Sequence, residues 1–181
     1  MSTYTIKGYR AIKGMDGDAY NVNLLRDGKK IAEVIYSGHG GPLDWDWCDR
    51  MKPRVEVEGA AADGTKYIVR QTQEEVRLRK YLEGKTYTLP GYPEEYPMDP
   101  DCFVDGLIND EMEKKQVLKW CRTKTVFRLK TDPENMGAWR TISVPFNQNV
   151  KVHLMKVYGD TLGVVMNEVL ADELIAKKGN K

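Results

Sequence analysis

Four prolines occur within the twelve residues from Leu89 to Pro100. Proline has no backbone N–H and a fixed φ, so this density is incompatible with the interior of a helix or a central strand. The segment predicts a stiff surface linker over residues 89–100. We therefore expect a β-rich N-terminal lobe over residues 1–88 and an α+β C-terminal lobe over residues 101–181, and we leave open whether the two pack as one domain.

Alternating apolar and polar residues predict antiparallel strands in the first half of the chain. The expected strands span residues 4–12, 19–25, 29–36 and 43–47. Asp27-Gly28 is a strong hairpin-turn signal, because glycine tolerates the positive φ that such turns require. In the last strand Trp45 and Trp47 should face the core, with the intervening acids in solvent. This part of the chain reads as a β-meander.

Residues 53–70 are ambiguous, because their alternation suits two strands but a short helix through Ala60 is also compatible. Helix-forming residues over 73–82, followed by Gly84, predict a helix with a glycine C-cap.

Helical spacing returns after the prolines. We expect a helix over residues 101–121, a hairpin of strands 123–129 and 138–144, a helix capped by Asn147, and a last helix that buries residues from Leu162 to Leu174. The sequence thus predicts an α+β protein with an N-terminal antiparallel β-meander, a Pro-rich linker and a C-terminal lobe of helix, β-hairpin and two helices.

The charges are segregated, although the net charge is only +1. Residues 86–113 contain eight acids and neither lysine nor arginine, whereas residues 119–156 carry eight bases and two acids. Such blocks indicate either interaction surfaces or two solvated faces that complement each other.

The acidic block suggests a protein interface, because a Pro-rich segment is partly ordered before binding and aromatic residues dominate interface hot spots. The partner-binding candidates are Tyr92, Glu94, Glu95, Tyr96, Asp99 and Phe103. The alternative is an internal strap, in which the aromatic residues pin the segment to the lobes.

The basic residues of the 123–145 hairpin suggest an alternative site for nucleotides or nucleic acid. The candidates are Arg128, Lys130, Trp139 and Arg140, with Phe127 as a second stacking surface. The competing interpretation places both aromatic rings in the core and leaves the bases solvated.

Catalytic signatures are sparse. His39, Asp44 and Asp46 are weak metal-ligand candidates for a small metal-dependent enzyme, which ranks third. The glycine-rich loop at 37–41 precedes a strand rather than a helix, so a sharp connection is favoured over a phosphate site. No nucleophile motif such as GxSxG occurs. We expect no cofactor and lean against an enzyme, without deciding the question.

Three widely spaced cysteines form no CxxC pair, which favours a reducing compartment. The chain shows no secretory signal and no apolar run of membrane-spanning length. We expect a cytoplasmic protein without membrane contact.

Several short segments resemble uncharacterised accessory proteins of phages and bacteria. They are residues 25–34 with Gly40-Gly41, residues 124–130, and residues 156–160 with 166–168. The resemblance brings no site residues. It implies a small intracellular protein, with a phage accessory factor as one version, that acts on host machinery. The leading expectation is therefore a non-enzymatic binding module or inhibitor that binds a host protein, in an undetermined oligomeric state.

Overall fold

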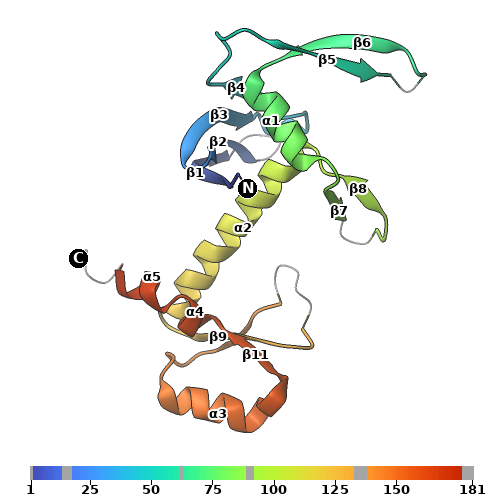
Figure 1. Ribbon diagram of the computed structural model, residues 1–181. Helices are drawn as coiled ribbons and strands as arrows, with labels where there is room; N and C mark the ends of the chain where they lie inside the picture. The colour runs from blue at the N-terminus through green and yellow to red at the C-terminus, as the bar shows by residue number, and fades with distance from the viewer. Residues whose placement is uncertain (1, 14–17, 62, 89–91, 133–137, 177–181) are drawn as a thin grey trace. The chain divides into compact units, whose positions relative to one another are not determined.

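The computed structural model describes the chain except for residues 1, 14–17, 62, 89–91, 133–137 and 177–181. It contains two compact units, Met1–Asn109 and Asp110–Lys181 (Figure 1). The boundary between them falls within the helix α2 (Pro100–Cys121). The helices and antiparallel sheets confirm the α+β class. No described helix is long and apolar enough to cross a membrane.

The first unit is built on a four-stranded antiparallel sheet in the order β1-β2-β3-β4. Its strands are β1 (Tyr4–Lys13), β2 (Asp18–Arg26), β3 (Lys29–Tyr36) and β4 (Asp44–Trp47). Between β2 and β3, Asp27 and Gly28 have φ of 51° and 79°, the left-handed pair that a tight hairpin requires. The predicted β-meander is confirmed, whereas the expected turn between β1 and β2 lies largely outside the described residues.

Two helices cover one face of this sheet. Leu78 and Leu82 of α1 (Gln73–Leu82), together with Val104 and Ile108 of α2, are buried against the strands. Trp47 joins them and is 9% exposed, as the alternation predicted. Burial of each large apolar side chain contributes roughly 1.5–3 kcal/mol, so this layer holds the sheet and helices together.

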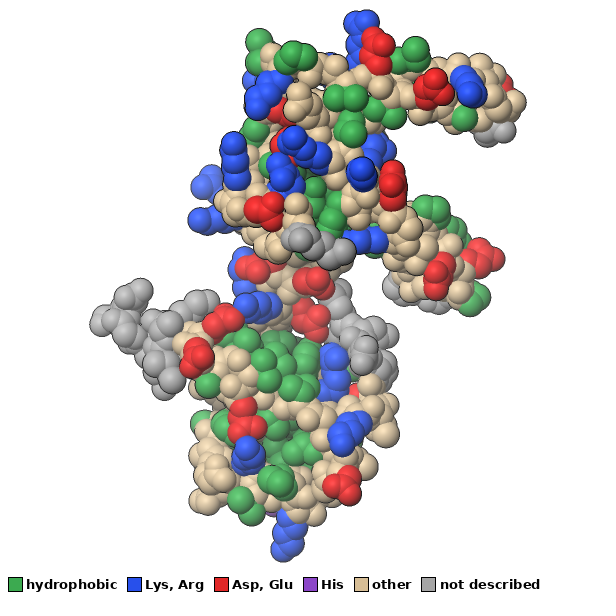
Figure 2. Space-filling view, viewed as in Figure 1, with side chains coloured by type: hydrophobic (Ala, Val, Ile, Leu, Met, Phe, Trp, Pro, Cys, Tyr) green, Lys and Arg blue, Asp and Glu red, His purple; other side chains and the backbone are tan. Residues whose placement is uncertain are grey.

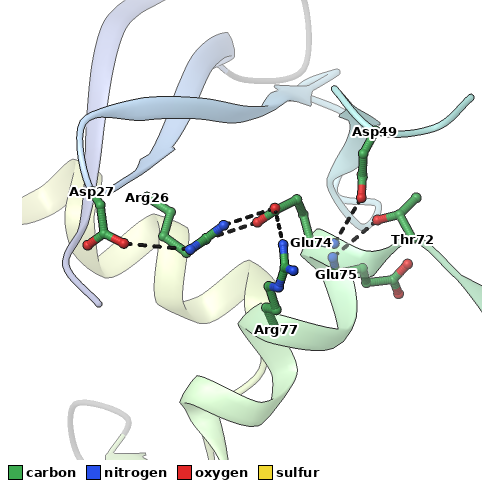
Figure 3. A network of polar contacts seen from close by, with 7 residues as sticks. All are labelled: Arg26, Asp27, Asp49, Thr72, Glu74, Glu75 and Arg77. Carbon is green, nitrogen blue, oxygen red and sulfur yellow. Dashed lines mark hydrogen bonds and ion pairs between the residues drawn. The ribbon is translucent and has the colours of Figure 1, made fainter. Parts of the chain in front are cut away.

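Side chains from the preceding segments satisfy the first N–H groups of α1 (Figure 3). Thr72 Oγ1 accepts a hydrogen bond from Glu75 N at 3.1 Å, and Asp49 Oδ2 accepts one from Glu74 N at 3.1 Å. Such caps satisfy backbone donors that a helix cannot pair internally. They fix the point at which α1 begins.

The Glu74 carboxylate also ties α1 to the sheet. Arg26, at the end of β2, donates two hydrogen bonds to it at 3.0 Å, and Arg77 adds a third at 2.6 Å (Figure 3). Burial alone would raise the pKa of Glu74, but the hydrogen bonds and charges of Arg26 and Arg77 hold it below its usual value. The carboxylate therefore remains ionised and paired at neutral pH.

Two further hairpins extend the first unit. They are β5 (Val55–Ala60) with β6 (Lys66–Gln71), and β7 (Thr86–Thr88) with β8 (Glu95–Pro97). Strands therefore account for most of residues 53–70, and the described residues of this range form no helix; Ala62, which the short helix would have included, lies outside the described residues. Our expectation of no regular structure among the prolines is wrong for β8. Pro97 is tolerated there because both strands of a two-stranded sheet are edges.

The second unit surrounds a three-stranded antiparallel sheet in the order β10-β9-β11. After α2 come β9 (Thr125–Leu129), β10 (Arg140–Ile142), α3 (Gln148–Tyr158), the 3₁₀ turn η1 (Gly159–Thr161), β11 (Leu162–Val165), α4 (Met166–Val169) and α5 (Ala171–Ala176). The expected hairpin and the Asn147 cap are confirmed, with Asn147 Oδ1 accepting from Val150 N at 3.1 Å. The expected turn of that hairpin lies mostly outside the described residues.

The last predicted helix is wrong at its start, because Leu162–Val165 forms a strand that pairs with β9. Close approach of the two backbones explains the difference. A Cβ on Gly163 would lie 2.8 Å from the carbonyl oxygen of Arg128, so the pairing requires glycine. The helical periodicity begins only at Met166, in the short helices α4 and α5.

Candidate functional site

Two carboxylates of α2 point toward the sheet of the first unit. Asp101 accepts hydrogen bonds from Trp45 Nε1 at 2.9 Å and from Leu43 N at 3.1 Å. One turn later, Asp105 accepts a hydrogen bond of 2.5 Å from the hydroxyl of Tyr20. Residues four apart share one helix face, so both carboxylates are brought to the same place. Neutral donors hold both of them in position.

Tyr20 keeps its proton at neutral pH. Burial of the ring is the largest cause that raises its pKa, and the hydrogen bond to Asp105 adds to it. The phenol therefore remains the hydrogen-bond donor to the Asp105 carboxylate.

Aromatic rings line this part of the sheet. The ring centroids of Tyr9 and Tyr20 are 5.7 Å apart, and those of Tyr20 and Tyr36 are 5.4 Å apart. Trp45 and Trp47 stack at 4.9 Å. Aromatic faces carry negative electrostatic potential, which adds to that of the carboxylates.

Two neighbouring cavities share Leu43 and Asp101. The first has a volume of about 340 Å³ and is lined by Tyr20, Tyr36, Gly40, Gly41, Leu43, Asp101 and Asp105. The second, of about 310 Å³, includes Arg79, which pairs with Glu75 at 3.2 Å. Among described residues, the lining of the first cavity contains no lysine or arginine. Its carboxylates thus face a space without a resident lysine or arginine.

The candidates on the β7–β8 hairpin lie at the surface. Tyr92 is 62% exposed, and Glu94 and Glu95 are also exposed. Tyr96 is half-buried, with its ring 5.9 Å from that of Tyr87. Figure 2 shows acidic but no basic side chains on this hairpin. It is a local surface of one charge sign.

Asp99 and Phe103 have local structural contacts. Asp99 Oδ1 accepts from Cys102 N at 2.8 Å and so caps the start of α2. The Phe103 ring packs against Tyr4 and Tyr81, with centroid distances of 5.9 and 5.7 Å. Phe103 therefore helps to hold α2 on the core, while Asp99 remains exposed.

The acids between Glu94 and Asp105 share one property. Neutral groups donate hydrogen bonds to them: the Thr86 and Tyr96 hydroxyls, backbone N–H groups, the Trp45 indole and the Tyr20 phenol. In the described part of the chain, none of them forms an ion pair with a lysine or arginine. We call this set the acidic face; it comprises Glu94, Glu95, Asp99, Asp101 and Asp105.

The weak metal candidates are not gathered into a site. Within the described residues, no three histidine, cysteine or acidic side chains lie close enough to share a metal ion. Asp44 and Asp46 are exposed as predicted, and Asp46 pairs with Arg50. In the adjoining glycine-rich loop, Gly40 N donates to the Tyr36 hydroxyl at 3.1 Å, so at least one backbone donor is already engaged.

The basic hairpin of the second unit is partly neutralised by its own acid. Arg140 donates to both oxygens of Asp132, at 2.8 and 2.7 Å. The hydrogen bonds from Arg140, followed by that from Leu129 N, lower the pKa of Asp132 to about 2. The Arg140 charge is thus balanced within the chain, and Lys130 remains exposed.

The two aromatic rings of this hairpin, Phe127 and Trp139, have different surroundings. Phe127 is 2% exposed and lies in the core. The Arg128 guanidinium lies 4.0 Å from the centroid of the Trp139 ring, whose Nε1 donates to Glu113 at 2.5 Å. Base stacking on either ring would require the hairpin to rearrange.

No protein-family model, curated protein or solved structure matches this chain. Its function must therefore be inferred from its own residues.

The sequence identified the acidic block but not the cavity beside it. In the sequence, Asp101 and Asp105 are two of the eight acids of residues 86–113, and Tyr20 and Tyr36 belong to predicted strands. The spacing of the two aspartates by one helical turn was the available signal. The residues that complete the cavity lie between 58 and 85 positions earlier in the sequence, so no local pattern joins them.

Proposed function

We propose that this protein is a non-enzymatic binding module whose acidic face recognises a positively charged segment of another protein. The supporting observation is that its five carboxylates form no ion pair with a described lysine or arginine. A carboxylate already paired with a resident cation gains little from a second one, whereas an unpaired carboxylate attracts a cationic partner at long range.

The fixed orientation of these carboxylates also favours binding. Hydrogen bonds to Trp45, Leu43 and Tyr20 hold Asp101 and Asp105 in place before any partner arrives. Less side-chain entropy is then lost on association. Tyr92 supplies an exposed aromatic anchor near the acids of the hairpin, and aromatic residues are enriched among interface hot spots.

A cytoplasmic phage accessory factor or inhibitor that binds a host protein is the biological role we propose. All three cysteines are free, which suits a reducing compartment. The resemblance to phage and bacterial accessory proteins supports the same role by association. The nucleic-acid alternative has less support, because Arg140 pairs with Asp132 and Trp139 is covered by Arg128.

The test is a peptide array that spans a range of net charges, probed with the purified protein. We expect binding to be enriched on peptides rich in lysine and arginine. Glu94→Lys with Glu95→Lys should abolish most of this enrichment without lowering the melting temperature, because exposed charges contribute little to stability. In any variant that tests Asp99, this residue is replaced with Asn rather than Lys, because the Asn side-chain oxygen can still cap α2.

The matched control carries the same charge change on the other hairpin. Glu56→Lys with Glu58→Lys alters two exposed acids of β5, which form ion pairs with Arg70 and Lys66. This variant should retain the preference for basic peptides. Equal loss in both variants, or no preference in the wild type, would refute recognition by the acidic face.

A further inference from the structure

We propose that the cavity lined by Tyr20, Tyr36, Gly40, Gly41, Asp101 and Asp105 binds the guanidinium group of an arginine side chain. We call it the tyrosine–aspartate pocket. This inference rests on the proposed function and specifies which residue of the basic segment enters the protein.

The pocket combines two features that favour a cation. Its tyrosine rings come from directly paired positions of β2 and β3, so they lie beside each other on one face of the sheet. Its aspartates come from successive turns of α2. A cation placed here would lie among tyrosine rings, whose faces attract cations, and two carboxylates.

The hydrogen bonds of the pocket hold its two carboxylates in place and leave them able to accept further hydrogen bonds. Tyr20 donates a hydrogen bond to Asp105 Oδ1 at 2.5 Å, and the carboxylate has a second oxygen, Oδ2, that can also accept. Asp101 accepts one hydrogen bond on each oxygen, at 2.9 and 3.1 Å, and each carboxylate oxygen can accept more than one. The start of α2 carries about half a positive charge from its dipole, which two carboxylates exceed.

The shape favours arginine over lysine. A planar guanidinium stacks on aromatic rings and donates through several N–H groups to separated acceptors, whereas an ammonium is a compact and more strongly hydrated charge. The volume of about 340 Å³ exceeds what one ammonium needs and leaves room for a planar group with part of its aliphatic chain. Gly40 and Gly41 leave their part of the lining without side chains, and a Cβ on either would meet open space.

The experiment titrates N-acetyl-arginine methylamide into the full chain and follows the tyrosine ring signals by NMR. The lysine and glutamine analogues serve as comparison ligands. We expect the arginine compound to shift the Tyr20 and Tyr36 signals in a saturable manner. The lysine compound should bind more weakly, and the neutral glutamine compound should have no effect.

Paired variants test the contributions of the Tyr36 ring and of the Asp105 charge to binding, separately from effects on folding. Tyr36→Leu removes a ring and should weaken binding about 2- to 30-fold, the range of a cation–π contact, whereas Tyr36→Phe keeps the ring and should bind nearly as well. Asp105→Asn keeps an acceptor for Tyr20 but removes the charge, and should weaken binding. Asp44→Asn removes an exposed charge outside the pocket lining and should have no effect.

Equal shifts with the arginine and glutamine compounds, or unchanged affinity in Asp105→Asn, would refute binding of a cation in the tyrosine–aspartate pocket. Equal affinity for arginine and lysine would overturn the guanidinium assignment. If Tyr36→Leu does not fold, Asp105→Asn alone decides the question. If the NMR titration is negative but the peptide array still shows charge-dependent binding, only the arginine pocket is refuted. If both experiments are negative, the proposed function is refuted as well.

Discussion

A single buried amide, that of Asn167, connects three backbone segments of the second unit. Its Nδ2 donates to the carbonyl oxygens of Cys121 and Lys124, at 3.0 and 2.9 Å, and its Oδ1 accepts from Val126 N at 2.8 Å. Asn167 is 5% exposed. It therefore fastens the end of α2 and the start of β9 to α4.

Replacing Asn167 with Ala should destabilise the protein by about 2–4 kcal/mol, because buried backbone groups would lose their partners and an unpaired buried polar group costs about 1–3 kcal/mol. The unfolding midpoint in urea measures this. Asn149→Ala, at an exposed position of α3, is the control and should change stability by less than about 0.5 kcal/mol. Equal effects at both positions would contradict the structural role.

At the residue scale, the sequence predicts features whose partners are close in the chain. The Asp27-Gly28 turn and the Asn147 cap depend on neighbours within a few positions, and both are confirmed. The role of Asn167 could not be predicted, because its partners lie 41 to 46 residues earlier. Nothing in the local sequence of α4 identifies them.

At the scale of elements, the β5–β6 hairpin stands apart from the rest of the first unit. Figure 1 shows it reaching outward beyond the N-terminal end of α1. Val55, Val57, Tyr67 and Val69 lie on one face, and Tyr67 crosses over Gly59, whose added Cβ would meet the ring at 2.6 Å. Most of its side chains are exposed. Two-stranded sheets are marginally stable in water unless they pack on something else.

Backbone amides of β5 and β6 should therefore exchange with deuterium by local opening, well before global unfolding. Those of β2 and β3 are covered by buried side chains such as Leu24 and Val34 and should exchange only on global unfolding. Hydrogen exchange followed by mass spectrometry distinguishes the two regions. Equal protection would contradict marginal stability of the β5–β6 hairpin.

Sequence periodicity predicts the bounds of some of these elements correctly. The predicted bounds of β3 and α1 match the observed ones, because alternation, caps and terminal glycines define both elements locally. The strand β11 was missed, because its apolar spacing also fits a helix and its conformation is decided by pairing with β9. Gly163 was the local signal against a helix.

For the whole molecule, the near-neutral charge conceals two blocks with different surroundings. In the basic block Arg140 and Lys151 pair with Asp132 and Glu168 of the same unit. The acidic face, in contrast, is held by neutral donors. Composition predicted the acidic surface, but only the fold shows which of its charges lie beside aromatic rings.

The central claim, that the acidic face captures a basic segment, is tested most directly by the association rate. The measurement is the association rate constant for an arginine-rich peptide, for the wild type and the Glu94→Lys, Glu95→Lys variant, over a range of ionic strength. We expect the wild-type rate to fall at least about 10-fold between low and high salt, the variant to associate slowly at every salt concentration, and dissociation to change much less. Association that is equally fast in both proteins and insensitive to salt would contradict the account.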